Sequence, residues 1–554
     1  MYKSLLFCIC LLMSLPAWSQ EQWEEAGEIQ EAEVVIEKDR EIVLPFQPRS
    51  FEKIPPAAIE TGGIKQEYVF PALDVTVPPT TVDIKALKLQ AEPLEKYYGN
   101  LIKLGYGNYN SPLGELYLYN KRNKQYLAGF QAKHLSFGKG PVDGKNSASG
   151  ETLLKGEASY FGDGFTASGD GFTASGDAYY KLSRFNFYGY DPSASVTEGE
   201  DSLKRNFNKY GVSVNIDNSS SESDISITGG LAYNGQSDNL GISENWVKVN
   251  ADLSMELQSA LTGHVGVFAD LIGYKDSLST SRQRIGLEPS VVYTGDNYQV
   301  SAGIRYVYQS DSLVPASQLY PVLKGKYQFG KLFGIFGELS GNSQLNTWQS
   351  MTARNPYLAA GVDIHNSNNI LNLGLGAQGN LAFMSYKVGL SQKVFKQFGV
   401  FLNSPNDPSK FILAYDTANF KVLDLYLASD FYIGSSLNLG LQVNYYNYQS
   451  DTFEEAWHMP GYRIAFNGSF LAFNKMRTKA GLAYLGGIKA YDWNLGQSEE
   501  LKAATDVYID LDYLLSERAT IFLQFHNLAN QQYQLLSNYP VRGLTFKAGF
   551  SYSF

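Results

Sequence analysis

The chain has 554 residues and a formal net charge of -10 at pH 7, with 14% aromatic and 18% charged residues. This acidic balance argues against a nucleic-acid partner. Beyond the N-terminus there is no run of about 18 apolar residues, which excludes a helical membrane protein, whereas 39 tyrosines and 52 glycines suit sheets that are apolar on one face only.

Residues 1–19 have the pattern of a secretory signal peptide. Lys3 supplies the positive start, an apolar stretch comes next, and the triplet at 17–19 (Ala-Trp-Ser) has the small-x-small form of a cleavage site. Both cysteines of the chain, Cys8 and Cys10, lie inside this segment, so the mature protein is expected to contain none. Disulfides and thiol chemistry are therefore excluded, and we expect no metal and no cofactor.

Residues 20–96 differ in kind from the rest of the chain, because they are first acidic and then rich in proline. Such proline density denies both a helix interior and a central strand, so we expect an extended periplasmic arm or a reduced plug. Within it, Glu33, Val34, Val35 and Ile36 form a short β-prone patch. This patch is either a motif that adds a strand to a periplasmic partner or one more extended piece of the arm.

From Tyr97 onward, apolar and polar residues alternate with a period of two. In the stretch 437–445 every odd position is Leu, Val or Tyr, and every even position is Asn, Gly or Gln. The last residues, 544–554, alternate in the same way up to the terminal carboxylate. One apolar face and one Asn/Gln/Gly face are typical of strands between lipid and water. The pattern predicts an all-β protein, a transmembrane antiparallel β-barrel over residues 97–554.

The connections between these strands provide a second signal. Counting back from the C-terminus, long links at 530–542, 487–500 and 449–458 alternate with short links at 516–518, 473–475 and 434–436. Outer-membrane barrels have short turns at the periplasmic rim and long loops at the surface. At roughly 20 residues per strand with its link, the region gives about 22 strands, a width at which the lumen has to be plugged.

Five carboxylates share the polar face of two predicted strands near the C-terminus, and we predict that they point into the lumen. An unpartnered carboxylate would be costly to bury there, so these groups should be hydrated or paired with basic groups of a plug or partner. The alternative is an ordinary solvated barrel wall. The five residues are Asp424, Asp430, Asp506, Asp510 and Asp512.

The sequence contains no catalytic or nucleotide-binding motif in the structural context that such a motif requires. The stretch 374–379 matches G-x-G-x-x-G formally, but it lies within an alternating strand with no helix after it. The five histidines are scattered and include no H-E-x-x-H. Spacing alone cannot exclude a Ser/His/Asp hydrolase, but nothing in the sequence favours one, so no enzyme activity is expected.

The end of the chain resembles the last two strands of TonB-dependent receptors. The resemblance lies in the Asn-Leu-Ala-Asn motif at 527–530, Tyr533, the Tyr-Pro pair at 539–540, the Arg-Gly pair at 542–543 and the closing stretch 550–554. The Arg-Gly order departs from the family's usual Pro-Gly-Arg. The family implies a 22-stranded barrel, a globular N-terminal plug and a TonB-binding box, which Glu33–Ile36 resembles in composition only. The proline-rich arm is shorter and more irregular than that plug.

The same resemblance identifies the aromatic terminus as a candidate recognition signal for the barrel-assembly machinery, with Phe550, Tyr552 and Phe554 as its residues. The sequence is compatible with two functions. The first is transport of a ligand across the outer membrane, with the lumen occluded by the arm or a partner. The second is a non-transporting barrel that serves as a scaffold or assembly subunit of an outer-membrane complex. The expected partners are outer-membrane lipid, the assembly machinery, TonB or another periplasmic protein, and a separate plug or surface lipoprotein.

Overall fold

The computed structural model describes residues 98–120, 123, 125–162, 171–190, 199, 201–218, 225–330, 332–493 and 495–554. The signal peptide, the N-terminal arm and its Glu33–Ile36 patch lie outside the described residues, so the expectations for these segments stay predictions.

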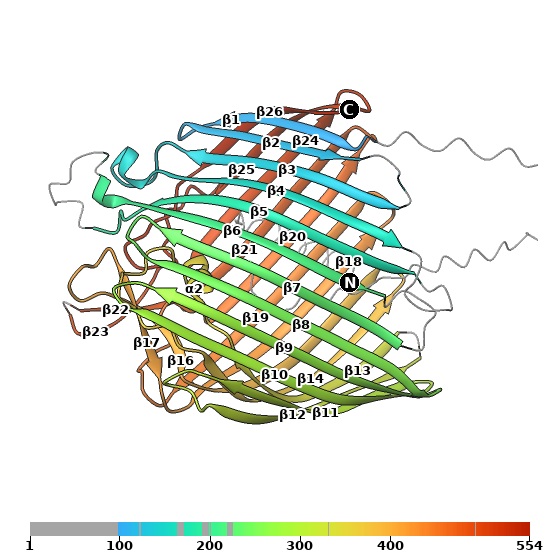
Figure 1. The fold of residues 1–554 in the computed structure, drawn as a ribbon. Helices are drawn as coiled ribbons and strands as arrows, with labels where there is room; N and C mark the ends of the chain where they lie inside the picture. The colour runs from blue at the N-terminus through green and yellow to red at the C-terminus, as the bar shows by residue number, and fades with distance from the viewer. Residues whose placement is uncertain are drawn as a thin grey trace, which may run out of the picture. The chain divides into compact units, whose positions relative to one another are not determined.

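The described chain forms a closed antiparallel barrel of 22 strands, which confirms the predicted fold. Each barrel strand pairs with the next, and β1 closes the ring by pairing with both β2 and β26 (Figure 1). The barrel strands are β1 (Asn100–Gly107), β2 (Ser111–Tyr119), β3 (Tyr126–Phe137), β4 (Ser149–Gly162), β5 (Phe172–Asn186), β6 (Lys204–Asp217), β7 (Ile225–Asp238), β8 (Ser243–Gln258), β9 (Leu261–Lys275), β10 (Ser279–Thr294), β11 (Tyr298–Gln309), β12 (Ser317–Phe329), β13 (Phe333–Gln344), β14 (Ser367–Leu381), β15 (Met384–Lys396), β18 (Phe420–Ile433), β19 (Leu437–Ser450), β20 (Tyr462–Ala472), β21 (Met476–Gly486), β24 (Ala504–Leu514), β25 (Ala519–His526) and β26 (Thr545–Ser553).

The remaining elements are short and lie in the links between barrel strands. Two hairpins lie outside the barrel sheet, namely β16 (Phe398–Asn403) paired with β17 (Phe411–Asp416) and β22 (Lys489–Asp492) paired with β23 (Gln497–Glu500). The helical elements are α2 (Trp348–Arg354), η1 (Gly144–Ser147) and η2 (Asp201–Leu203). Among the described residues, no helix is long and apolar enough to cross a membrane.

The two ends of the barrel differ as the spacing of the links predicted. The short links 434–436 and 473–475 have the predicted bounds and lie at the same end as the C-terminus (Figure 1). The long links carry α2 and both hairpins at the opposite end. The alternation of short and long links is weaker in the N-terminal half, where the link 108–110 at the long-loop end is short.

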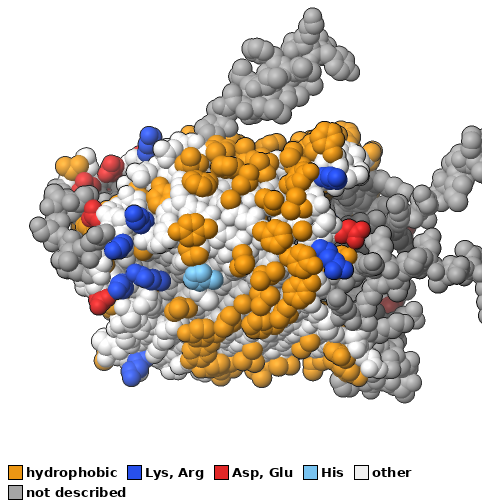
Figure 2. Space-filling model, turned by 90° about the horizontal axis from the view of Figure 1, so that it is seen from above, with side chains coloured by type: hydrophobic (Ala, Val, Ile, Leu, Met, Phe, Trp, Pro, Cys, Tyr) orange, Lys and Arg blue, Asp and Glu red, His pale blue; other side chains and the backbone are white. Residues whose placement is uncertain are grey.

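The outer surface is apolar because each strand turns every second side chain outward. On β1, Leu104 and Tyr106 are 57% and 58% exposed, whereas Lys103 and Gly105 between them face inward. Figure 2 shows hydrophobic side chains covering the middle of the barrel, with lysine, arginine and acidic groups gathered toward its two ends. An apolar band between charged rims is the exterior expected of a barrel that faces lipid.

Between β12 and β13, a side chain binds the backbone where the strand ladder stops. β12 and β13 pair only as far as Val322 and Ser340. A continued register would set Pro321 opposite Gly341, and proline has no N–H to donate. Arg305 on β11 instead donates to the Gly341 carbonyl at 3.0 Å. We call this part of the wall the arginine seam.

Candidate functional site

The predicted lumen carboxylates on β18 alternate with outward residues. Leu425 and Leu427 are exposed on the outer surface, so Asp424 and Asp430 point to the inside. The Asn444 amide donates to Asp424 Oδ1 at 3.1 Å. Asp424 is therefore partnered by a neighbouring wall residue.

On β24, Asp506, Asp510 and Asp512 alternate with Val507, Ile509 and Leu511 and so share one face of the strand. Asp506 is buried and accepts the backbone N–H of Asn527 at 2.7 Å. Asp510 Oδ1 lies 3.3 Å from His526 Nε2. Three strands separate β24 from β18, so the structure does not bring the five carboxylates together into one site.

The candidate assembly signal lies on β26, the last strand of the barrel. Phe550 and Phe554 face outward and are exposed, and the Tyr552 ring lies between theirs with both interplanar angles at 15°. This placement leaves the aromatic side chains on the lipid-facing surface. Their role in assembly stays a prediction.

The most developed site in the structure is one that the sequence did not reveal. Three long links, 345–366, 397–419 and 527–544, fold against one another and against the ends of β5 to β8; we call these three links the lid. Their buried apolar side chains form one cluster, the lid core, with members from links and wall. The lid core comprises Phe187, Phe207, Ile242, Trp348, Met351, Tyr357, Leu358, Val362, Ile364, Phe401, Phe411 and Tyr539.

Contacts within the lid join parts of the wall that are far apart around the ring. The link 397–419 starts from β15, and eight strands separate β15 from β6. Lys410 of that link nevertheless places its Nζ 5.6 Å from the centre of the Phe187 ring, in the link before β6. Tyr539 stacks on Tyr357 with ring centres 3.5 Å apart and donates through its hydroxyl to the Ser409 carbonyl. The lid therefore spans the long-loop mouth of the barrel.

One buried arginine anchors the lid to the wall. Arg205 on β6 is fully buried, pairs with Asp238 at 2.8 Å and also donates to the Leu358 carbonyl in the lid. Its guanidinium carbon lies 5.2 Å from the Trp348 ring centre and 4.9 Å from that of Phe207. Burial of a charge is tolerated only with such partners.

The short helix α2 is held by a buried acidic side chain, whereas Arg205 is basic. Glu244 at the end of β8 is buried and accepts the backbone N–H groups of Trp348 at 2.6 Å and Gln349 at 3.1 Å. These are N–H groups that the first turn of a helix leaves without intrahelical partners. On the helix itself, Thr352 accepts a hydrogen bond from Gln236 of β7 at 2.9 Å.

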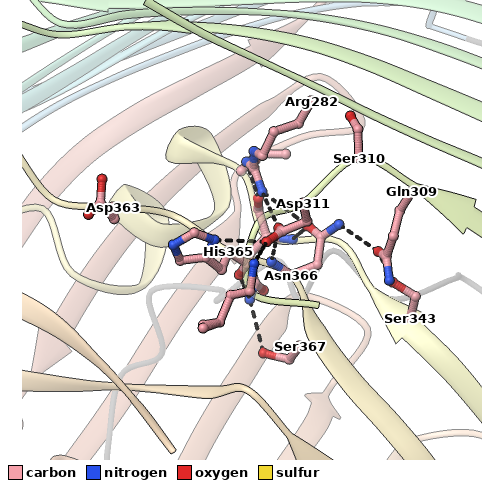
Figure 3. Close-up of polar contacts among 12 residues, drawn as sticks. Arg282, Gln309, Ser310, Asp311, Ser343, Asp363, His365, Asn366 and Ser367 are labelled. Carbon is pink, nitrogen blue, oxygen red and sulfur yellow. Dashed lines mark hydrogen bonds and ion pairs between the residues drawn. The ribbon is translucent and has the colours of Figure 1, made fainter. Parts of the chain in front are cut away.

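A polar network joins the lid link 345–366 to the wall strand β10 and to the link 310–316 (Figure 3). Asp311, in the link 310–316, accepts from His365 Nδ1 at 2.8 Å and from the Asn366 backbone N–H at 2.9 Å. Arg282 lies 3.6 Å from the same carboxylate and donates to the Asn346 carbonyl at 2.7 Å. Burial tends to raise the pKa of Asp311, but the hydrogen bonds outweigh it and lower the pKa.

A fourth link, 451–461, packs against the lid through a buried histidine. His458 lies with its Nδ1 3.0 Å from the Phe401 carbonyl and its ring edge-on to Phe411. Burial lowers the pKa of His458 to about 4, and the hydrogen bond to Phe401 only partly offsets this effect. The imidazole is therefore neutral at pH 7 and donates from Nδ1.

Some signal for the lid was present in the sequence, since the long links contain aromatic residues where exposed polar loops would be expected. Trp348, Tyr357, Phe411 and Tyr539 all lie between alternating segments. Among the described residues, no group of acidic or histidine side chains is arranged to hold a metal. What the described residues of this site do form is a packed apolar closure.

Comparison with solved structures shows which barrels this one resembles. The FrpB iron transporter from Neisseria meningitidis (F3-3 variant) has a TM-score of 0.63 at 11% identity, over 83% of this chain and 82% of that one. The siderophore receptor PirA from Acinetobacter baumannii gives 0.64 at 10%, over 84% and 81%. The ferric-catecholate import receptor Fiu from E. coli K12 gives 0.61 at 9%, over 83% and 82%.

A scan against protein-family models gives no match, and a search of curated proteins gives none either. Likeness at such low identity concerns the fold. The structure nevertheless confirms the expectation drawn from residues 527–554 at the level of architecture, in strand number and in closure. The chain therefore has the 22-stranded barrel fold of the TonB-dependent receptors.

Proposed function

We propose that the protein is an outer-membrane barrel that passes a ligand through its lumen, with the lid as the gate at the cell surface. One observation carries this proposal, the packing of links from distant parts of the wall into a shared buried core. A barrel needs such a closure if its lumen would otherwise be an open channel. Two structurally similar barrels, the iron transporter FrpB and the ferric-catecholate import receptor Fiu, support a transport function.

The second part of the proposal concerns the periplasmic side. We infer that the N-terminal arm at 20–96 or a partner protein occludes that end, and that TonB or another periplasmic protein engages the patch Glu33–Ile36. The charge and proline content of the arm support this inference. The lid and the arm would then close the barrel from its two ends.

Single-channel conductance of four proteins tests the proposal. They are the full mature chain, a chain without residues 20–96, a chain with Trp348→Ala in the lid, and a chain with both changes. If the lid and the arm close the lumen in series, each single change leaves the conductance low and the double change raises it sharply. A conductance that stays low in the double variant would rule out a gated lumen. A full rise on arm removal alone would show that the lid does not close the mouth.

A second function, a scaffold subunit of an outer-membrane complex, is favoured by the tip of the β22–β23 hairpin. Trp493 and Leu495 are 45% and 67% exposed there, beyond the mouth of the barrel. The Trp493 indole donates to the Asn403 carbonyl of the lid at 2.7 Å, which fixes the tip. Affinity purification from detergent-solubilised membranes distinguishes the two functions. A scaffold should retain a stoichiometric partner, and Leu495→Asn should abolish that retention. Leu278→Asn, on another exposed turn, is the matched control and should keep the partner.

A further inference from the structure

Three cationic side chains line the inner wall where the barrel closes between β26 and β1. Lys103 Nζ lies 4.4 Å from the ring centre of Phe522. Lys547 Nζ lies 4.7 Å from the ring centre of Phe137, and the guanidinium carbon of Arg542 lies 3.7 Å from the same ring. Cations and aromatic rings therefore alternate from the strand wall to the lid link 527–544. We call Lys103, Lys547 and Arg542 the basic track.

Glycines on the two closing strands let these side chains lie flat on the wall. A Cβ at Gly107 would be 2.6 Å from Lys547 Cγ, and a Cβ at Gly549 would be 2.3 Å from Phe522 Cζ. A Cβ would also lie 2.1 Å from the Phe546 carbonyl oxygen at Gly107 and 2.2 Å from the Leu104 carbonyl oxygen at Gly549, so a larger residue at either position would collide with the strand backbone as well as with these side chains. The sequence thus provides a cradle for the basic track.

The basic track has no carboxylate partner among the described residues. Arg542 donates to the Ser149 hydroxyl at 3.1 Å, and no ion pair joins any of the three cations to a described acid. The acid whose charge acts on Lys547 is Asp510, which is already next to His526. On β4 and β5, by contrast, Lys155 and Lys181 pair with glutamates.

The lack of a described carboxylate partner matters because Lys547 is buried. Lys547 is only 7% exposed, and a buried ammonium group is costly without a counter-charge. Contact with an aromatic face returns about 0.5–2 kcal/mol, which offsets only part of that cost. Three cations that share two rings also repel one another. An anion between them would remove both penalties.

We propose that the basic track is a binding site for an anionic ligand that carries carboxylate or phosphate groups. Arg542 belongs to the same link as Tyr539 of the lid core, so such a ligand would contact both wall and lid. The inference deepens the proposed function by naming a ligand class, and it rests on that function only for the route by which the ligand enters. The shared chemistry is an oxyanion; which oxyanion is for experiment to decide.

Calorimetric titration of the full mature protein in detergent tests this site with two probes, citrate and inorganic phosphate. We expect at least one of them to bind, and expect Lys547→Gln and Arg542→Gln each to weaken it at least tenfold. Lys547→Arg keeps the charge and should retain binding. Lys326→Gln, an exposed inward-facing lysine on β12, is the matched control. Heat-modifiability in gels verifies that each variant has a folded barrel.

Binding of citrate alone identifies a carboxylate ligand, and binding of phosphate alone identifies a phosphate-bearing one. Absence of binding by the full chain, or binding equally weakened by Lys326→Gln, would overturn the site. The conductance experiment tests the proposed function separately. A gated lumen without anion binding would refute the anion site and leave the proposed function standing. Anion binding without a rise in conductance in the double variant would refute the gated lumen and leave the anion site standing.

Discussion

The Arg205 guanidinium, which belongs to the wall strand β6, donates a hydrogen bond to the carbonyl of Leu358 in a link that starts from β13, with six strands between β6 and β13. The same guanidinium is paired with Asp238, and neither side chain of the pair is exposed. The lid and the wall therefore share one buried charge. Movement of the link 345–366 away from β6 has to separate the Leu358 carbonyl from this charge.

Removing that charge should loosen the lid. Arg205→Ala leaves Asp238 buried without its partner, a change that typically costs about 3–5 kcal/mol. We expect amide hydrogen exchange to rise in residues 348–358, while the strands β18 to β21 keep their protection. Lys248→Ala, an exposed inward-facing lysine on β8, is the control and should leave exchange unchanged. Unaltered exchange in the lid after Arg205→Ala would contradict the anchoring role.

Truncation of the largest side chain in the lid core should have a related effect. Trp348 is fully buried, and Trp→Ala changes in cores cost about 3–5 kcal/mol. Protease accessibility of the link 345–366 in intact cells measures the result, because a loosened lid exposes its backbone. Phe473→Ala, at an exposed position in the short link 473–475 at the other end of the barrel, should leave cleavage at the link 345–366 near the level of the parent protein.

The lid should also weaken in mild acid through His458. Its pKa is about 4 in the fold and about 6.5 in an unfolded chain, so the neutral form is the one that the fold favours. A histidine with a lowered pKa stabilises fully above pH 6.5, and this stability is lost as the pH falls from about 6.5 to about 4, by up to about 3 kcal/mol. Asp311 has a lowered pKa and adds a loss only below its ordinary range near 3.8.

His458→Gln is the variant that isolates this effect, because glutamine can donate to the Phe401 carbonyl but does not titrate. We expect exchange in residues 451–461, corrected for intrinsic rates, to rise in the parent protein between pH 7.5 and pH 5. The variant should show a flatter profile. Equal pH dependence in both proteins would exclude His458 as the origin.

The arginine seam predicts a stability effect in the wall itself. Arg305→Met leaves the Gly341 carbonyl and the Glu288 carboxylate without their donor, which costs about 1–3 kcal/mol for a buried group. We expect a lower thermal midpoint in detergent than for Lys324→Met, an exposed lysine on β12. Adding Pro321→Val, which supplies an N–H opposite Gly341, should recover part of the loss. No recovery would show that the ladder cannot extend past Val322.

The C-terminal aromatic residues provide a test in the cell. Phe554 is the last residue, and its ring continues the outward series of Phe550 and Tyr552. If this series is recognised by the barrel-assembly machinery, deletion of Phe554 should lower the amount of heat-modifiable barrel in outer membranes. Parent-level insertion would refute the role.

The barrel could be predicted because its determinants are local. Alternation at 437–445 and the short links at 434–436 and 473–475 arise from the two-residue period of a strand, and repetition then fixes strand number within a narrow range. The inward orientation of Asp424 and Asp506 has its origin in the same period.

The lid could not be predicted for the opposite reason. Phe187 and Lys410 are more than two hundred positions apart, and no period relates a loop residue to its partner across a ring. Arg205 looked like any residue of a wall strand, because its burial depends on Leu358 and Trp348 arriving from elsewhere. The arginine seam could not be predicted either. A proline such as Pro321 can interrupt a strand ladder, but the hydrogen bond from Arg305 to the Gly341 carbonyl depends on how three strands are arranged in space.

The most direct test of the lid is a distance across the mouth of the barrel. The mature chain is expected to lack cysteine, so Leu240→Cys and Asn406→Cys would allow spin labels on exposed links that start from distant strands, with β9 to β14 between them. Pulsed electron paramagnetic resonance in nanodiscs should give one narrow distance, because the link 397–419 is packed in the lid core. A broad distribution in the parent background, no narrower than that of Trp348→Ala, would show that the links move freely and that the mouth has no lid.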